Sequence, residues 1–126
     1  MEIKINPELN AKGLYSTKSY LKDEIVFTLA GKLYDYPTRE TIYIGDNKHI
    51  YDEFGIFMNH SFTPSTRIDG HNVVALRDIK VNDEITFNYN DSELKMATPF
   101  YVNNILVDGN DNNVKERKNY RKFIEK

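Results

Sequence analysis

NHSFTPS at residues 59–65 and NDEITFNY at residues 82–89 are the two stretches that decide how this chain folds. In the second stretch, β-branched and aromatic residues dominate residues 85–89, which predicts a strand. Side chains alternate between the two faces of a strand, so we expect Phe87 and Tyr89 on the same side. Asn-His-Ser alone is a weak signal. Its combination with Pro64 and the later Glu-Ile-Thr-Phe-x-Tyr run is much more specific.

The rest of the chain consists mainly of short predicted strands separated by turn residues, a pattern typical of a β-rich fold. Alternating or β-branched runs predict these strands at residues 2–5, 13–16, 24–29, 41–44 and 72–76. Gly45-Asp46-Asn47 and Asp69-Gly70 are turn sequences, and the second is the strongest hairpin signal in the chain. The pattern at residues 52–58 is ambiguous and fits a short helical turn.

The composition is that of one globular domain without a metal centre. The chain has 126 residues, of which 40% are apolar and 29% charged. It contains no cysteine, which excludes disulfides and cysteine-ligated zinc or iron–sulfur centres. Asp108, Asn110 and Asn112 alternate as in a calcium loop, but the turn glycine is missing and Asn119 stands where glutamate is needed. We therefore expect no metal site.

Charge is distributed unevenly along the chain. Residues 114–126 carry six Lys/Arg and two Glu, a net +4, while residues 1–113 carry a net −6. An acidic body suits a basic peptide substrate and gives no reason to expect nucleic-acid binding, although ordinary solvated surface explains the same charge. Residues 114–126 also predict a short helix docked on the domain, with Tyr120, Phe123 and Ile124 on one side.

The apolar runs of the chain give no sign of membrane insertion or secretion. None is long enough to span a bilayer, and the first residues lack the apolar core of a signal peptide. We therefore expect an intracellular protein, cytoplasmic or nuclear, that does not associate with membranes.

The motifs resemble the SET-domain family of protein lysine methyltransferases, and especially its small stand-alone members of bacterial type. AKGLY at residues 11–15 is similar to the family's Gly-x-Gly-(Leu/Val)-(Phe/Tyr) turn. Residues 59–65 are similar to Asn-His-Ser-Cys-x-Pro-Asn, and residues 82–89 to Gly-Glu-Glu-Leu-Thr-Phe-Asp-Tyr. Further similarity to the small members lies at residues 41–45, 49–50 and 96–100, so that the resemblance covers about residues 10 to 100.

The resemblance implies a mainly β fold made of several small, twisted sheets. It also implies that the segment after Tyr89 threads under a preceding loop as a pseudoknot, an exception to unknotted topology. Such threading would bring Asn59 and His60 beside Tyr89. We expect the SET domain at residues 1–113, with a shortened post-SET-like segment at about 91–113, followed by the basic helix at 114–126.

The resemblance further implies transfer of a methyl group from S-adenosylmethionine to a lysine side chain of a protein or peptide, with S-adenosylhomocysteine as the product. Main-chain groups around Lys12, Gly13 and Leu14 are then expected at the methionine part of the donor. Asn59 is expected at its amino acid end, because an amide can both donate and accept. The backbone of His60 is expected at the adenine, and no zinc is required.

Tyr89 is the expected catalytic residue and also lies at the donor. Its hydroxyl can orient the lysine near the reacting methyl group, and its ring face favours a nearby cation. An unperturbed phenol has a pKa of about 10, so positioning is its first role. By resemblance, Phe87 leaves room for di- or trimethylation, and Tyr43 and Phe100 line the lysine channel.

The chain departs from the family's pattern at Ala11, Ser65 and Asn88, which replace a glycine, an asparagine and an aspartate. The post-SET cysteines that bind zinc in other members are also missing. The lysine channel is then either open or closed by the packing of Phe100, Tyr101, Ile105 and the C-terminal helix.

Each expected site residue also has a purely structural interpretation. Gly13 can be a turn glycine, His60 a buried histidine and Tyr89 a core aromatic residue. The alternative function is accordingly a non-catalytic SET-like module that binds a peptide or a partner protein.

Overall fold

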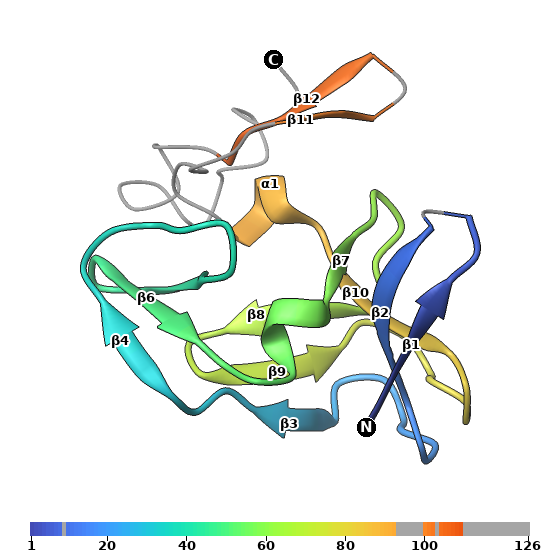
Figure 1. Cartoon of the computed structure of the whole chain (residues 1–126). Coiled ribbons are helices and arrows are strands. Elements are labelled where there is room, and N and C mark those ends of the chain that lie inside the picture. Colours follow the sequence, from blue (N-terminus) through green and yellow to red (C-terminus); the bar gives the residue numbers. More distant parts are fainter. Residues whose placement is uncertain (9, 93–99, 103, 110–126) are drawn as a thin grey trace.

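The computed structural model describes residues 1–8, 10–92, 100–102 and 104–109 (Figure 1). These residues form short strands, one 3₁₀ turn (η1) and one helical turn (α1). In chain order the elements are β1 (Glu2–Asn6), β2 (Ala11–Tyr15), β3 (Ile25–Thr28), β4 (Lys32–Tyr34), β5 (Ile42–Gly45), β6 (Lys48–Tyr51), η1 (Gly55–Phe57), β7 (Asn59–His60), β8 (Thr66–Asp69), β9 (Asn72–Ala75), β10 (Glu84–Phe87), α1 (Tyr89–Ser92), β11 (Phe100–Val102) and β12 (Ile105–Val107). The expected β-rich fold of several small sheets is confirmed.

The largest sheet has the strand order β1-β2-β10-β7. Antiparallel pairing joins β1 to β2 and β2 to β10, where Ile85 lies opposite Leu14. The last pair is parallel, with Asn59 opposite Thr86 and His60 opposite Phe87. This sheet therefore brings together the two motifs that are far apart in the sequence.

Two three-stranded sheets, β3-β9-β8 and β4-β6-β5, and the two-stranded sheet β11-β12 complete the fold. The predicted Asp69-Gly70 hairpin is present between β8 and β9, and Gly70 has a φ of 60°. Asp46 and Asn47 also have positive φ and turn β5 into β6. Positive φ at two consecutive residues is the geometry that matches the twist of a two-residue hairpin.

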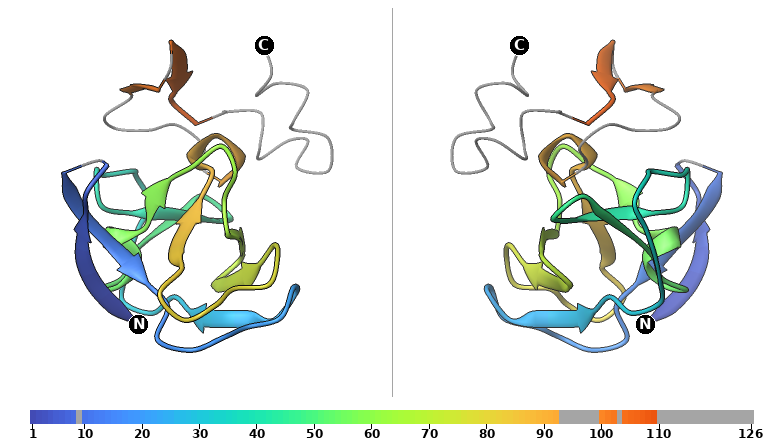
Figure 2. Two further views of the ribbon diagram at one scale, coloured as in Figure 1. Left: turned by 90° about the vertical axis from the view of Figure 1, so that its right-hand side faces the viewer. Right: turned by 90° about the vertical axis from the view of Figure 1, so that its left-hand side faces the viewer.

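The hydrophobic core lies between the small sheets. It includes Leu14 and Ile85 from the largest sheet, Val73 from β9, Ile50 from β6 and Met58 just before β7. Figure 1 shows the β4–β6 strands at one side of the molecule and the β1–β2 pair at the other. Both side views in Figure 2 show the β11–β12 hairpin above α1. Residues next to or within β7 and β10 belong to this core, and Tyr89 at the start of α1 packs against it.

The prediction of a strand at residues 85–89 is wrong at its end, because β10 stops at Phe87 and Tyr89 begins α1. The reason is local: the Asn88 side-chain oxygen accepts the backbone N–H of Asn90 at 3.0 Å, and its carbonyl oxygen accepts the N–H of Asp91 at 3.0 Å. A side chain that caps a helical turn in this way competes with continued strand pairing.

The strand predicted at residues 13–16 is confirmed as β2, which begins earlier, at Ala11. Gly13 lies within this strand, so its interpretation as a turn glycine is wrong. The helical turn proposed for residues 52–58 is confirmed in part, as η1. Six strands were not predicted, because each is short and depends on its partner strand: β4, β6, β7, β8, β11 and β12.

Several expectations lie outside the described residues. They concern the basic helix at 114–126, the end of the calcium-like loop at 110–113, and most of residues 96–100. The expected pseudoknot depends on residues 93–99 and stays a prediction, as do the domain boundaries. Within the part of the chain that is described, no helix is long and apolar enough to cross a membrane.

Candidate active site

Tyr89 and the Asn59-His60 pair meet at the end of the parallel β7–β10 ladder. The backbone N–H of Ser61 donates to the carbonyl of Phe87 at 3.1 Å and extends the ladder. The N–H of Tyr89 then donates to Nδ1 of His60 at 3.1 Å, although these residues are 29 positions apart. Their rings lie 5.2 Å apart. The expected juxtaposition of His60 and Tyr89 is therefore present, and Asn59 precedes His60 in β7.

The Tyr89 hydroxyl has a defined orientation. It donates its proton to the backbone carbonyl of Met58 at 2.6 Å, and Met58 is buried in the core. A phenol has only one proton to donate. Toward any other group, the Tyr89 oxygen can therefore act only as an acceptor, which supports a positioning role.

His60 is held as a neutral imidazole. Burial lowers its pKa from 6.5 to about 4. Because Nδ1 accepts the Tyr89 N–H, the ring proton belongs on Nε2. Nε2 is buried and has no hydrogen-bond partner among the described residues. Buried N–H groups without a hydrogen-bond partner are rare in folded proteins, so this one indicates a site for an acceptor atom of a ligand.

Aromatic rings surround His60 and Tyr89. The Phe87 ring lies 4.7 Å from that of Tyr89, and Phe62 lies 4.4 Å from His60. Phe100 lies 6.0 Å from both His60 and Tyr89 and meets them edge-on. Phe87 and Tyr89 thus pack together as expected, but through the turn into α1 rather than through strand alternation. These five residues are called the aromatic cluster below.

The side-chain amide of Asn59 uses both of its hydrogens. Nδ2 donates to Oε2 of Glu84 at 2.8 Å and to the backbone carbonyl of Lys12 at 3.2 Å. Oε1 of Glu84 accepts from Nδ2 of Asn6 at 2.7 Å. Asn59 thus has only its oxygen left for a further partner. The Asn59 amide was expected both to donate to a ligand and to accept from it. In the structure its oxygen can accept, while its N–H groups are used within the protein.

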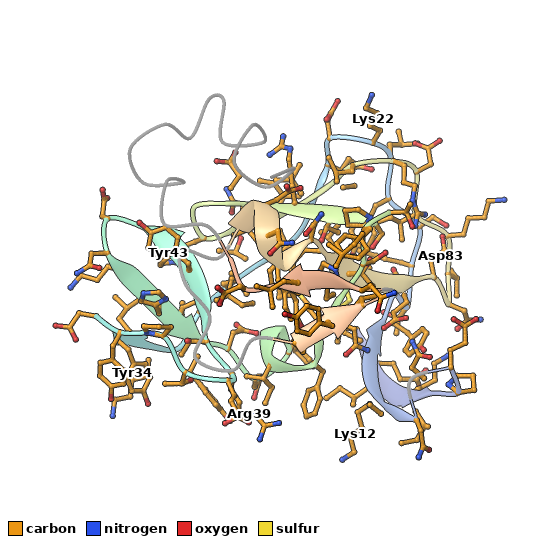
Figure 3. All side chains as sticks on the ribbon, turned by 90° about the horizontal axis from the view of Figure 1, so that it is seen from above. Lys12, Lys22, Tyr34, Arg39, Tyr43 and Asp83 are labelled. Carbon is orange, nitrogen blue, oxygen red and sulfur yellow. The ribbon has the colours of Figure 1, made fainter. Side chains whose placement is uncertain are left out.

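Gly13 makes room for this arrangement. A Cβ atom at this position would lie 2.7 Å from Oε2 of Glu84 and 3.1 Å from Nδ2 of Asn59. Lys12 contributes its carbonyl oxygen, while its side chain extends away from the sheet with Nζ 5.8 Å from the Phe57 ring (Figure 3). Leu14 is fully buried in the core. Of the three residues expected at the methionine part of the donor, Lys12 and Gly13 therefore border Asn59.

The two weaker candidates for the lysine channel lie in different surroundings. Phe100 belongs to the aromatic cluster. Tyr43 is buried in β5, packs with its ring 5.0 Å from that of His49, and accepts the N–H of Asn47 at 3.4 Å. The side chains of Tyr101 and Ile105, which were expected to close the lysine channel by packing, are 70% and 51% exposed. They are therefore not packed over Tyr89.

Sequence reasoning did not single out Glu84, Asn6 or Met58. A carboxylate at the start of β10, directly before its apolar residues, was a signal that could have indicated Glu84. Nothing in the sequence marks Asn6 or the carbonyl of Met58, because both reach the site only through tertiary pairing.

Comparison with known proteins identifies the family. The SET domain family matches residues 11–90. The fold is similar to the crystal structure of a candidate histone methyltransferase of Plasmodium falciparum, with 23% identity, a TM-score of 0.55, and coverage of 70% of this chain and 94% of that chain. No match to a curated protein sequence is found. Since the family match spans more than half of the chain and includes Asn59, His60 and Tyr89, the chain belongs to the SET-domain methyltransferase family.

Proposed function

We propose that this chain is a protein-lysine N-methyltransferase that uses S-adenosylmethionine as its donor. One observation supports this proposal above all. Tyr89 is hydrogen-bonded to both residues that flank Asn59 in the chain: its hydroxyl donates to the Met58 carbonyl, and its backbone N–H donates to Nδ1 of His60.

The residues present fit this donor. Asn59 offers an oriented carbonyl oxygen, which suits the ammonium group at the donor's amino acid end. The unpartnered Nε2–H of His60 offers a buried donor, which suits an acceptor on the ligand. When bound, S-adenosylmethionine supplies an electrophilic methyl carbon, and transfer leaves S-adenosylhomocysteine.

The side chains around Tyr89 would orient the nucleophile. A lysine attacks as its neutral amine, in line with the bond that breaks, and correct alignment of this kind contributes several kcal/mol. The Tyr89 oxygen, whose proton is committed to Met58, can accept an N–H of the lysine and so direct its lone pair. The buried ring of Phe87 limits the access of water on one side of Tyr89. Desolvation of this kind lowers the pKa of a lysine toward neutrality.

The proposed substrate is a protein or peptide with an accessible lysine in a basic context. The net charge of −6 over residues 1–113 favours association with such a partner. The exposed Tyr101 and Ile105 of the β11–β12 hairpin favour the second candidate, a non-catalytic module that binds a partner protein.

Donor binding and methyl transfer separate these two functions. Titration calorimetry with S-adenosylmethionine is expected to show one site per chain, and incubation with methyl-labelled donor and basic proteins is expected to yield methyl-lysine by mass spectrometry. Donor binding without transfer to any lysine in a lysate would favour the non-catalytic module. Absence of donor binding by the folded chain would refute the proposed enzyme.

A further inference from the structure

The carboxylate of Glu84 joins three strands at the edge of the candidate donor site. Glu84 lies in β10 and accepts from Asn6 in β1 at 2.7 Å and from Asn59 in β7 at 2.8 Å. Gly13 in β2 leaves the space through which Glu84 and Asn59 meet. Both oxygens of one carboxylate therefore accept hydrogen bonds from side-chain amides, and these amides come from β1 and β7, the two edge strands of the same sheet.

This arrangement decides which way the Asn59 amide faces. With the present orientation, its two N–H groups meet two acceptors, the Glu84 carboxylate and the Lys12 carbonyl. A rotation of the amide by 180° would instead place its oxygen against both of these oxygens. Such an arrangement loses two hydrogen bonds and adds repulsion to a charged group. The Asn59 oxygen is therefore directed away from Glu84.

The charge of Glu84 is not neutralised by a cation among the described residues. The ion pairs in that part of the chain are Lys4 with Glu2 and Arg67 with Asp69. The Glu84 carboxylate also affects a neighbouring side chain. Burial raises the pKa of Tyr15 above its usual value, and the negative charges of Glu84 and Glu8 raise it further. A ligand cation at the Asn59 oxygen would therefore experience an attractive field.

We propose that Glu84 is a positioning residue, supported by Asn6, that holds the Asn59 amide as an acceptor and makes the donor site selective for a ligand with an ammonium end. This inference rests on the proposed function, because it names the part of the donor that Glu84 selects. Glu84 acts through Asn59.

The test compares two ligands that differ in one group. S-adenosylhomocysteine carries the ammonium group, and its desamino analogue lacks it. Titration calorimetry on the wild-type chain is expected to show that the desamino analogue binds about tenfold more weakly or worse, since a hydrogen bond to a charged group contributes at least this much. In Glu84→Gln, S-adenosylhomocysteine should lose about tenfold in affinity, whereas the analogue should lose little.

A double variant that combines Asn6→Asp with Glu84→Gln provides the rescue, because it exchanges the carboxylate and the amide between the two positions. The carboxylate placed in β1 would accept the amide hydrogens of the glutamine placed in β10, whose oxygen would again accept from Asn59. Both the orientation of Asn59 and one negative charge would therefore return. We expect the preference for S-adenosylhomocysteine to recover to within about threefold of wild type. Glu53→Gln, which removes an exposed carboxylate, is the matched control and should leave both affinities unchanged.

The outcomes are distinguishable. A folded wild-type chain that binds neither ligand would overturn the proposed function itself. Wild-type binding combined with an unchanged ligand preference in Glu84→Gln, or with an equal loss for both ligands, would overturn the role of Glu84. Should Glu84→Gln fail to fold, Asn6→Ala keeps the charge but removes its support. It should then weaken S-adenosylhomocysteine selectively by about threefold, and no selective loss would contradict the inference.

Discussion

Replacing Tyr89 by phenylalanine removes a single oxygen atom from the candidate active site. The ring can keep its contacts with Phe87 at 4.7 Å and with His60 at 5.2 Å, because these involve the aromatic carbons. What disappears is the hydrogen bond of 2.6 Å to the Met58 carbonyl and the acceptor that we assign to lysine orientation. The variant therefore separates the hydroxyl from the packing.

The structure predicts effects of different size on stability and on turnover. Met58 is buried, so its carbonyl loses a partner that water replaces poorly. The free energy of unfolding should fall by about 1–2 kcal/mol. In a domain of this size such a loss corresponds to a fall in Tm of roughly 4–8 °C. Methyl transfer should fall much further, by about a hundredfold or more, because misplacement of a reacting group by one ångström can cost that much.

The assay is methyl transfer to a lysine peptide under single-turnover conditions, at a temperature well below the Tm of the variant. Donor affinity is measured in parallel by calorimetry and should change by less than about threefold, since the ring remains in place. Tyr36→Phe is the matched control, because its side chain is 56% exposed and its ring packs against Tyr34. Equal transfer rates in wild type and Tyr89→Phe would remove the Tyr89 hydroxyl from the mechanism.

Three further predictions test the surroundings of the site. Ser65→Ala removes a buried hydroxyl that donates to the Glu84 carbonyl at 2.8 Å and accepts from the Thr86 N–H at 3.0 Å. Urea unfolding should therefore show that the free energy of unfolding falls by about 2–3 kcal/mol, with an unchanged m-value. A fall below about 0.5 kcal/mol, on the order of a surface substitution, would contradict the importance of these two hydrogen bonds. Phe87→Tyr adds a hydroxyl to a nearly fully buried ring and should shift the product toward monomethyl-lysine in the mass spectrum of the peptide; an unchanged product ratio would show that this side chain does not limit methyl addition. The folded-state pKa of His60, about 4, is below its unfolded value, so its stabilising contribution is complete above pH 6.5 and is lost as the pH falls toward 4. Because solvent screens this partly exposed ring, we expect a loss of only about 1–2 kcal/mol. His60→Gln should flatten this part of the stability curve, whereas parallel curves would refute the assignment.

Much of the fold follows from local sequence signals. The Asp69-Gly70 and Asp46-Asn47 turns and the β-branched runs of β3 and β9 specify their own backbone through nearest neighbours. Their positions were therefore predictable to within one or two residues. The hydrophobic sides of β2 and β10 likewise follow from Leu14 and Ile85, both of which are buried.

Other features depended on competition between local preferences. Residues 85–89 have the composition of a strand, yet Asn88 caps a helical turn and ends β10 at Phe87. Phe87 and Tyr89 do lie together, as predicted, but the turn into α1 brings them together and not the alternation of side chains along a strand. Strand periodicity cannot reveal such a case, because a capping bond and the strand preference of a residue are of similar size, each about 1 kcal/mol.

The amino-acid sequence by itself determined the family, the β-rich class and the identity of the two motifs, because turn residues, β-branched runs and motif spacing act over a few neighbouring positions. Only the tertiary structure decided the orientation of the Asn59 amide, the hydrogen bond from Tyr89 to Met58 and the position of Glu84 between Asn6 and Asn59. These contacts join strands that are distant in the chain. Their geometry comes from the order of the strands in one sheet, which no local pattern encodes.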